Sequence, residues 1–200
     1  MILVLCGKSG SGKDTILKEL VKDGFTPIVT TTTRPMRQGE EQGVEYNFVT
    51  NDKFFKMLQD GEFLETRQFH TFNSEKSDIW YYGTTVSNID NTENNVIVLD
   101  INGTRVLTDY FGKQNCYVVY IDVMDEVRTI RAKRRKSFDQ CEWNRRMITD
   151  DEDFTEDKIA SVANVTINNN FDNVSYAVEN IERLFWEYKK SHSSFLGKYK

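Results

Sequence analysis

A glycine-rich segment near the start of the chain has the spacing of a phosphate-binding loop. It runs from Gly7 to Thr15, reads GKSGSGKDT and fits the pattern G-x-x-x-x-G-K. Glycines let the backbone turn tightly, so that its N–H groups can surround phosphate oxygens as an anion-binding nest. Lys13 stands where a lysine reaches the β- and γ-phosphates of a nucleoside triphosphate. The residues predicted to bind ATP are Gly7, Ser9, Gly10, Ser11, Gly12, Lys13, Asp14 and Thr15.

Two acidic residues are candidates for holding the Mg²⁺ that accompanies ATP. The residue after the lysine is normally Ser or Thr, but this chain has Asp14, whose carboxylate can hold Mg²⁺ directly or through water. Asp100 ends the apolar run VIVLD, and an acid at the carboxyl end of a parallel strand lies near such a loop. We therefore predict Asp14 and Asp100 as magnesium ligands. Capping the following turn is the alternative role for Asp100.

The segments around the loop predict a parallel α/β sheet. Ile2–Cys6 is an unbroken apolar run, which is typical of a strand buried on both faces. Residues 14–23 place their apolar side chains on one helical face, and Gly24 ends that helix. Strand, glycine loop and helix together open a βαβ unit. Further strands are expected at 96–100, 117–121 and 165–168, and further helices at 104–111, 125–135, 142–149 and from about 172.

Composition excludes several classes of protein. The chain has 26 basic and 31 acidic residues and a formal net charge of -5, which argues against a nucleic-acid binder with a broad basic surface. Three widely spaced cysteines and two histidines give no zinc spacing. The apolar N-terminus is too short for a signal peptide or a membrane span. We expect a cytoplasmic protein with neither nucleic acid nor membrane as partner.

The segment that begins at Val29 carries a resemblance to a known family. It reads VTTTTRPMRQGEEQGVEYNFV, and it resembles the acceptor region of guanylate kinases: a Ser/Thr run, Arg-x-x-Arg, Gly-Glu, Gly, and an acidic-Tyr-x-Phe ending. GEFLE at 61–65 and YYGT at 81–84 resemble two further motifs of that family. With the phosphate loop included, the resemblance extends over nearly the whole chain.

The resemblance implies how an acceptor nucleotide would be held. Two arginines and two tyrosines would bind the GMP phosphate, since guanidinium groups match phosphate oxygens. Glu65 would accept hydrogen bonds from guanine N1–H and N2–H, with Thr30 and Thr84 on the other side of the base. The alternative is that these arginines and Glu65 are merely solvated surface charges with no part in binding a nucleotide. The predicted GMP-binding residues are Thr30, Arg34, Arg37, Tyr46, Glu65, Tyr82, Thr84 and Asn102.

Two departures from the family pattern concern the acceptor site. The family has a second acid where this chain has Asn102, which leaves base selectivity open. The segment 70–80 is longer than the family's usual link, and we expect it to form an extended loop.

A basic segment at 125–149 corresponds to the family's lid, whose arginines close over the triphosphate. Phosphoryl transfer spreads negative charge over the equatorial oxygens, so catalysis depends on positioning and on cations. A solvated basic helix face is the alternative for several of these residues. The predicted catalytic residues are Lys13, Arg34, Arg131, Arg135 and Arg146.

Together these features predict a single domain with a P-loop parallel sheet core and two insertions. The core comprises 1–29, 86–124 and 150–200, the NMP-binding flap 30–85 and the lid 125–149. The expected reaction is ATP-dependent phosphorylation of GMP or dGMP, with Mg²⁺. The alternatives are a kinase for another nucleoside monophosphate or ribose 1,5-bisphosphate, or a non-catalytic binding module. The acceptor motif with Glu65 argues against the bisphosphate, and Lys13 against the module.

Overall fold

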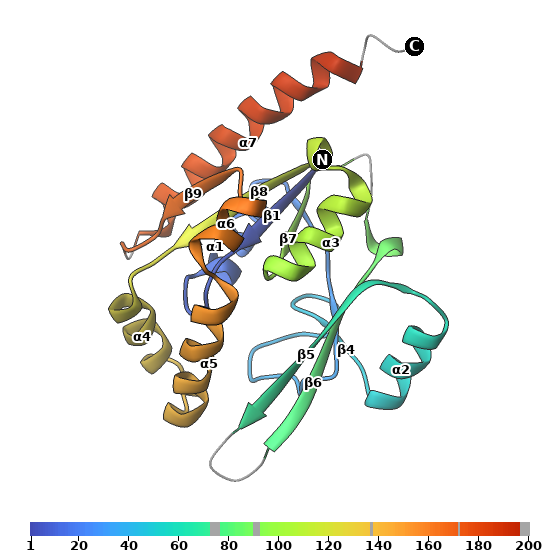
Figure 1. The fold of residues 1–200 in the computed structure, drawn as a ribbon, viewed down its shortest axis with the longest axis vertical. Coiled ribbons are helices and arrows are strands. Elements are labelled where there is room, and N and C mark those ends of the chain that lie inside the picture. The colour runs from blue at the N-terminus through green and yellow to red at the C-terminus, as the bar shows by residue number, and fades with distance from the viewer. Residues whose placement is uncertain (73–76, 90–92, 137, 172, 197–200) are drawn as a thin grey trace.

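The computed structural model describes residues 1–72, 77–89, 93–136, 138–171 and 173–196, and it contains two sheets (Figure 1). The first has five parallel strands in the order β2-β7-β1-β8-β9. This order confirms the predicted parallel α/β core. The strands are β1 (Ile2–Cys6), β2 (Thr26–Pro27), β7 (Asn95–Val98), β8 (Cys116–Asp122) and β9 (Val165–Asn168).

Both faces of this sheet are covered, which explains why the β1 sequence shows no alternation. Leu3 and Leu5 point to the face covered by α1 (Lys13–Lys22) and α7 (Val174–Leu196). Val4 and Cys6 point to the opposite face, covered by α3 (Ile101–Phe111) and α6 (Glu156–Val162). The five residues of β1 are all buried. The sheet therefore holds the loop after β1 on a rigid base.

Residues 31–85 contain the second sheet, in the order β4-β3-β6-β5. A long antiparallel pair, β5 with β6, projects away from the core at the end opposite α7 (Figure 1). Phe54 of α2 is buried and stacks on Phe63 of β5 at 4.6 Å between ring centroids. The elements are β3 (Thr31–Thr32), β4 (Asn47–Phe48), α2 (Asn51–Gln59), β5 (Phe63–Phe72) and β6 (Ser77–Thr85).

The expectation of an extended loop at 70–80 is wrong for the described residues. His70 pairs with Ile79 and Thr71 with Asp78, so both strands continue into this segment. This segment contains aromatic residues and the β-branched Thr71 and Ile79, which favour strands. Residues 73–76 of that segment lie outside the described residues.

The remaining helices are α4 (Asp125–Lys133) and α5 (Gln140–Asp153), with 3₁₀ turns at Val86–Asn88 and Lys113–Asn115. The strands and helices expected from the sequence are confirmed to within a few residues. Helices α2 and α6 were not expected. Helix α6 is short, whereas in α2 the helical spacing of Phe54, Met57 and Leu58 was a signal that was overlooked. In the described part of the chain, no helix combines the length and apolar character needed to cross a membrane.

Candidate active site

The loop between β1 and α1 is shaped by glycines and encloses the lysine side chain. Gly10 and Gly12 have φ of 78° and 94°, and a Cβ on Gly12 would approach Asn169 Nδ2 to 2.8 Å. Lys13 Nζ donates to the carbonyl oxygens of Gly7 and Lys8 at 2.6 and 2.9 Å. The ammonium group is therefore held inside the curve of the loop, where phosphates would bind.

The surroundings of Lys13 tune its charge. Burial lowers the pKa of Lys13, and the charges of Asp14 and Asp150 oppose that effect. Asp14 and Thr15 lie exposed in the first turn of α1, whose N-terminus adds positive potential. The site thus combines a desolvated cation with a solvent-facing carboxylate next to it.

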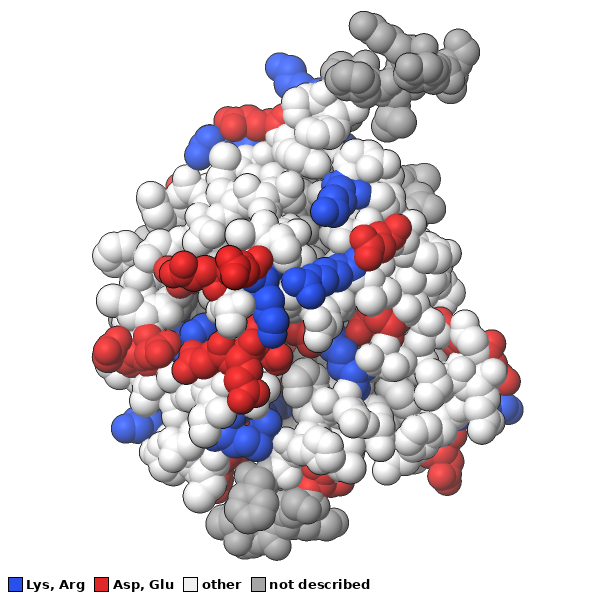
Figure 2. Space-filling model, in the orientation of Figure 1, with Lys and Arg blue, Asp and Glu red and all other residues white. Residues whose placement is uncertain are grey.

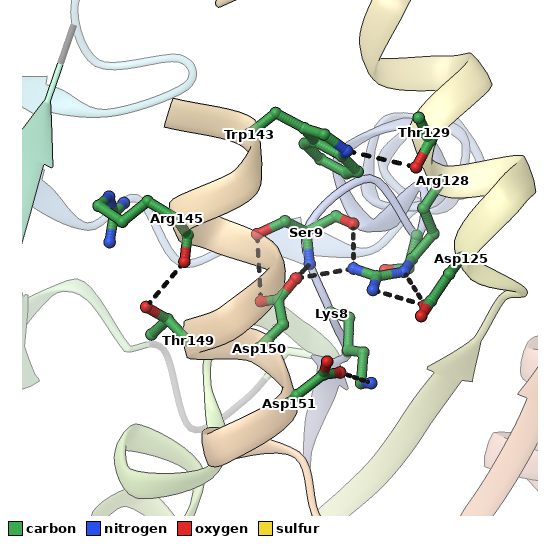
Figure 3. A network of polar contacts seen from close by, with 12 residues as sticks. Lys8, Ser9, Asp125, Arg128, Thr129, Trp143, Arg145, Thr149, Asp150 and Asp151 are labelled. Carbon is green, nitrogen blue, oxygen red and sulfur yellow. Dashed lines mark hydrogen bonds and ion pairs between the residues drawn. The ribbon is translucent and has the colours of Figure 1, made fainter. Parts of the chain in front are cut away.

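A buried ion network ties the loop to α4 and α5 (Figure 3). Asp150 accepts from Ser9 N at 2.8 Å and from Ser9 Oγ at 3.2 Å. Arg128, which is fully buried, donates Nη1 to Asp150 at 2.7 Å and to the Ser9 carbonyl at 2.8 Å. Its Nη2 and Nε both reach Asp125, at 2.7 and 3.1 Å. These contacts fix the first half of the loop against the two helices.

The sequence reasoning missed this network. Arg128 was counted only among the basic residues of its segment, yet it lies on the same helical face as the buried Ala132, four residues on. That spacing was the available signal. Asp150 belongs to an acidic run that ends at Asp153. Acidic side chains gather on the surface in this part of the molecule, around the end of α5 and the start of α6 (Figure 2).

The predicted lid arginines occupy two places. Arg131 donates Nη2 to the Phe171 carbonyl at 2.9 Å, and its Nη1 would lie 3.8 Å from a Cβ on Gly12. Arg135 is exposed on α4's C-terminal side, close enough for its charge to lower the pKa of Lys13. Arg146 pairs with Glu142 at 2.7 Å. Two of the three therefore lie near the loop, while the third sits on α5.

The predicted acceptor-phosphate residues gather on the second sheet. Arg34 is buried and its Cζ lies 5.3 Å from the centre of the Tyr46 ring. The rings of Tyr46 and Tyr82 are 5.8 Å apart. Burial raises the pKa of Tyr46, and the charge of Asp14 adds to this effect. Lys18 of α1 pairs with Glu45, the residue before Tyr46, at 2.8 Å, so the cluster lies beside the helix that follows the phosphate loop.

Glu40 orders the arginines of this cluster. Arg34 Nη2 donates to both carboxylate oxygens of Glu40, at 2.8 and 3.0 Å, and Arg37 N donates to one of them at 2.8 Å. Burial, then the charges of Arg34 and Arg146, lower the pKa of Arg37. Arg37 and Arg146 therefore bring positive charge together from two separate segments, as an anion site requires.

Glu65, which is predicted to bind the guanine base, contacts Thr84 and Arg67. Its Oε1 accepts from Thr84 Oγ1 at 2.6 Å, and its Oε2 lies 3.2 Å from Arg67 Nε. Arg67 Nη1 lies 3.1 Å from Asp100 Oδ2. Burial lowers the pKa of Arg67, but Asp100 and Glu65 outweigh burial, so this pKa is raised. Thr30 is buried in the same sheet region.

Arg67 is a second residue that the sequence reasoning missed. The signal was alternation, because residues 65 and 67 of one strand point to the same face. Asn102 is exposed in the first turn of α3. Asp100 caps that helix, since its Oδ1 accepts from Gly103 N at 2.8 Å. The capping role weighed for Asp100 is thus present, and its second oxygen faces Arg67.

The carboxylates fit Mg²⁺ unequally. No group of three or more His, Cys, Asp or Glu side chains that could hold a metal occurs among the described residues. Mg²⁺ in nucleotide sites needs only one or two carboxylates, because phosphates and water complete its shell. Asp14, exposed beside the loop, suits that part. Asp100 fits less well, because both of its oxygens already face protein donors.

Comparison with known proteins adds to this geometry. The family model for guanylate kinase matches residues 1–188. The chain belongs to the guanylate kinase family. It is 35% identical to a guanylate kinase of Helicobacter hepaticus over 117 residues, which is 56% of this chain and 54% of that relative. It is 36% identical to one of Thermotoga maritima over 124 residues, 60% of this chain and 56% of that relative.

A solved structure and a more distant relative match over greater lengths. The guanylate kinase of Oleidesulfovibrio alaskensis is 29% identical over 173 residues, 76% of this chain and 80% of that relative. The crystal structure of guanylate kinase from Anaplasma phagocytophilum superposes with a TM-score of 0.64 at 18% identity, covering 94% of this chain and 85% of that one. The fold is therefore the guanylate kinase fold, while the chain spans about half the length of the Helicobacter and Thermotoga relatives in its matches.

Proposed function

We propose that this protein phosphorylates GMP or dGMP with ATP as the phosphoryl donor and Mg²⁺ as cofactor. The observation that carries this is the pairing of two sites. A glycine loop with an enclosed lysine suits a triphosphate, and a cluster of Arg34, Tyr46 and Tyr82 on the second sheet lies beside the helix that follows that loop. The matching relatives carry the name guanylate kinase, which supports the same reaction.

The residues would divide the work by position. Lys13 would stabilise the transferring phosphoryl group, and Arg131, Arg135 and Arg146 would add positive charge from the lid. Bound Mg²⁺ would neutralise charge on the phosphate oxygens, with Asp14 as its protein ligand. No protein nucleophile is needed, since positioning and electrostatic stabilisation supply catalysis.

The acceptor would lie across the second sheet. Arg34, Arg37, Tyr46 and Tyr82 would hold its phosphate. Glu65 would accept from the N1–H and N2–H groups of guanine, an edge with two adjacent donors. Thr30, Thr84 and Asn102 would complete the base pocket.

We further propose that the chain moves as three parts: a core of 1–29, 86–124 and 150–200, an NMP-binding flap at 30–85 and a lid at 125–149. Closure of the flap and lid would exclude water and limit hydrolysis of ATP. ATP and the acceptor would then be the partners of this protein. We place its activity in the cytoplasm, which suits its free cysteines.

An assay of ADP release tests the function. Purified protein with ATP and Mg²⁺ is supplied in turn with GMP, dGMP, AMP, CMP, UMP, dTMP and ribose 1,5-bisphosphate. We expect GMP and dGMP to give the highest kcat/KM. Turnover with another acceptor alone would reassign the substrate, and no turnover with any acceptor would favour a binding module.

A further inference from the structure

Arg67 lies where the two sheets approach each other, between two carboxylates. Its side chain is 16% exposed, its Nε lies 3.2 Å from Glu65 Oε2, and its Nη1 lies 3.1 Å from Asp100 Oδ2. Glu65 belongs to β5 of the second sheet, whereas Asp100 follows β7 of the core sheet. Recognition of guanine by Glu65 needs no neighbouring cation. Recognition of guanine by Glu65 therefore does not explain why a largely buried arginine lies at this position.

Two atoms of this group lack hydrogen bonds. Glu65 Oε2 and Arg67 Nε are both buried, and neither makes a hydrogen bond of acceptable geometry within the described part of the chain, although they are 3.2 Å apart. Leaving buried polar atoms without partners is costly. An acceptor and a donor side by side are complementary to a ligand that presents a donor and an acceptor in adjacent positions. Guanine has two such pairs, N1–H beside O6 and N2–H beside N3.

The strand register selects between these two pairs. Glu65 is opposite Thr84, and Arg67 is opposite Tyr82 on the neighbouring strand. Tyr82 is a proposed ligand of the acceptor phosphate, so the step from Glu65 to Arg67 runs from the base toward the phosphate. In a guanine nucleotide N3 lies on the sugar side of the base and O6 on the far side. Arg67 thus faces the N2–H and N3 edge.

We propose that Arg67 determines acceptor specificity by donating its Nε–H to N3 of guanine, while Glu65 Oε2 accepts from the N2 amino group. This deepens the proposed function and rests on it. Asp100 holds the guanidinium in place through its ion pair.

Nucleotide analogues test the proposal on the unmodified protein. We compare kcat/KM for GMP, for 3-deaza-GMP, which has C–H in place of N3, and for 6-thio-GMP, which weakens the acceptor at position 6. Wild type should use 3-deaza-GMP about ten- to a hundredfold less well than GMP, the loss expected for one buried hydrogen bond. It should use 6-thio-GMP nearly as well as GMP. Equal values for GMP and 3-deaza-GMP, or a loss confined to 6-thio-GMP, would overturn the proposal.

Variants of Arg67 separate reading of the base from a merely structural role. Arg67→Met should lower kcat/KM for GMP to about the wild-type value for 3-deaza-GMP, abolish discrimination between the two, and leave the KM for ATP unchanged. Arg67→Lys keeps the positive charge but lacks the planar guanidinium donor, so it should recover only part of the discrimination between GMP and 3-deaza-GMP. Discrimination retained in Arg67→Met would refute the role. If Arg67→Met does not fold, the comparison of GMP with 3-deaza-GMP in the wild-type protein still tests the role of Arg67. If the wild-type protein does not use GMP at all, the proposed function is refuted instead.

Discussion

Arg128 and Arg67 are both arginines enclosed by carboxylates, one beside the phosphate loop and one at the base end of the acceptor site. Arg128 is fully buried, and its Nε, Nη1 and Nη2 all donate to protein oxygens. Arg67 keeps a partly exposed side chain, and its Nε lacks a hydrogen bond among the described residues. A network in which every donor has an acceptor stabilises the fold around it, whereas a network with an unsatisfied donor and acceptor is suited to binding a ligand.

We therefore expect the region around Arg128 to provide rigidity and the region around Arg67 to provide ligand recognition. Around Arg128, the loop, α4 and α5 are joined by charged hydrogen bonds, so the protein alone holds the proposed ATP site in shape. Around Arg67, the partners come from two separate sheets, since Glu65 belongs to β5 and Asp100 follows β7. We expect changes beside Arg128 to affect stability first, and changes beside Arg67 to affect acceptor use first.

The largest effect should come from removing the carboxylate that pairs with Arg128. Asp150→Ala leaves a buried guanidinium with fewer partners, and we expect a loss of about 3 kcal/mol in the free energy of unfolding. Urea denaturation measures this directly. As a matched control, Arg128→Met combined with Asp150→Leu should recover much of that stability, because apolar residues need no charged partner. A single variant as stable as wild type would contradict the structural role of the network.

Removing Glu65, at the proposed base pocket, should have a smaller effect on stability and a selective effect on use of the acceptor. Glu65→Ala should raise the KM for GMP about ten- to a hundredfold, since two base N–H groups lose their acceptor. Steady-state kinetics with each substrate varied in turn would show the KM for ATP unchanged. Urea denaturation should show a smaller loss of stability than Asp150→Ala. Equal increases in both KM values would remove Glu65 from the base pocket.

Asp14 tests whether the donor region also handles the metal. Asp14→Ala removes the carboxylate beside the loop and supplies no other ligand, so the Mg²⁺ concentration for half-maximal rate should rise severalfold. Thr15→Ser, at the neighbouring exposed position, keeps its hydroxyl, serves as the control and should leave this concentration unchanged. An unaltered Mg²⁺ dependence in Asp14→Ala would rule out this ligand.

The smallest effect concerns acid stability at the acceptor region. Burial raises the pKa of Glu40, but the Arg34 guanidinium and the Arg37 N–H outweigh it and hold this pKa below the ordinary 4.5. A depressed pKa contributes stability that is complete above about pH 4.5 and is lost as the pH falls through the folded-state value. Wild type should thus exceed Glu40→Gln by under about 1 kcal/mol at neutral pH. Thermal denaturation should show the two converging in acid, and a constant difference would contradict the ion pair.

Much of the fold was predictable because its signals are local. The apolar run of β1, the glycines that follow it and the helix after them are contiguous, and each depends on the intrinsic properties of neighbouring residues. The segment 70–80 was mistaken for an extended loop, because its length was given more weight than its aromatic and β-branched residues. Helix α6 was missed because seven residues give too few turns for a clear apolar face, while the apolar face of α2 was present in the sequence and was overlooked.

The sequence by itself indicated the family, which the family model confirms, and it predicted the phosphate loop and the acceptor residues, since their motifs are short and local. Only the tertiary structure decided that Asp150 meets Ser9 across 141 residues, and that Arg67 lies between Glu65 and Asp100. Alternation places Glu65 and Arg67 on one face of β5, but the pairing of Arg67 with Asp100 and of Ser9 with Asp150 depends on how sheets and helices cross in space. Whether a charged side chain is solvated or buried against a partner is settled by that geometry alone.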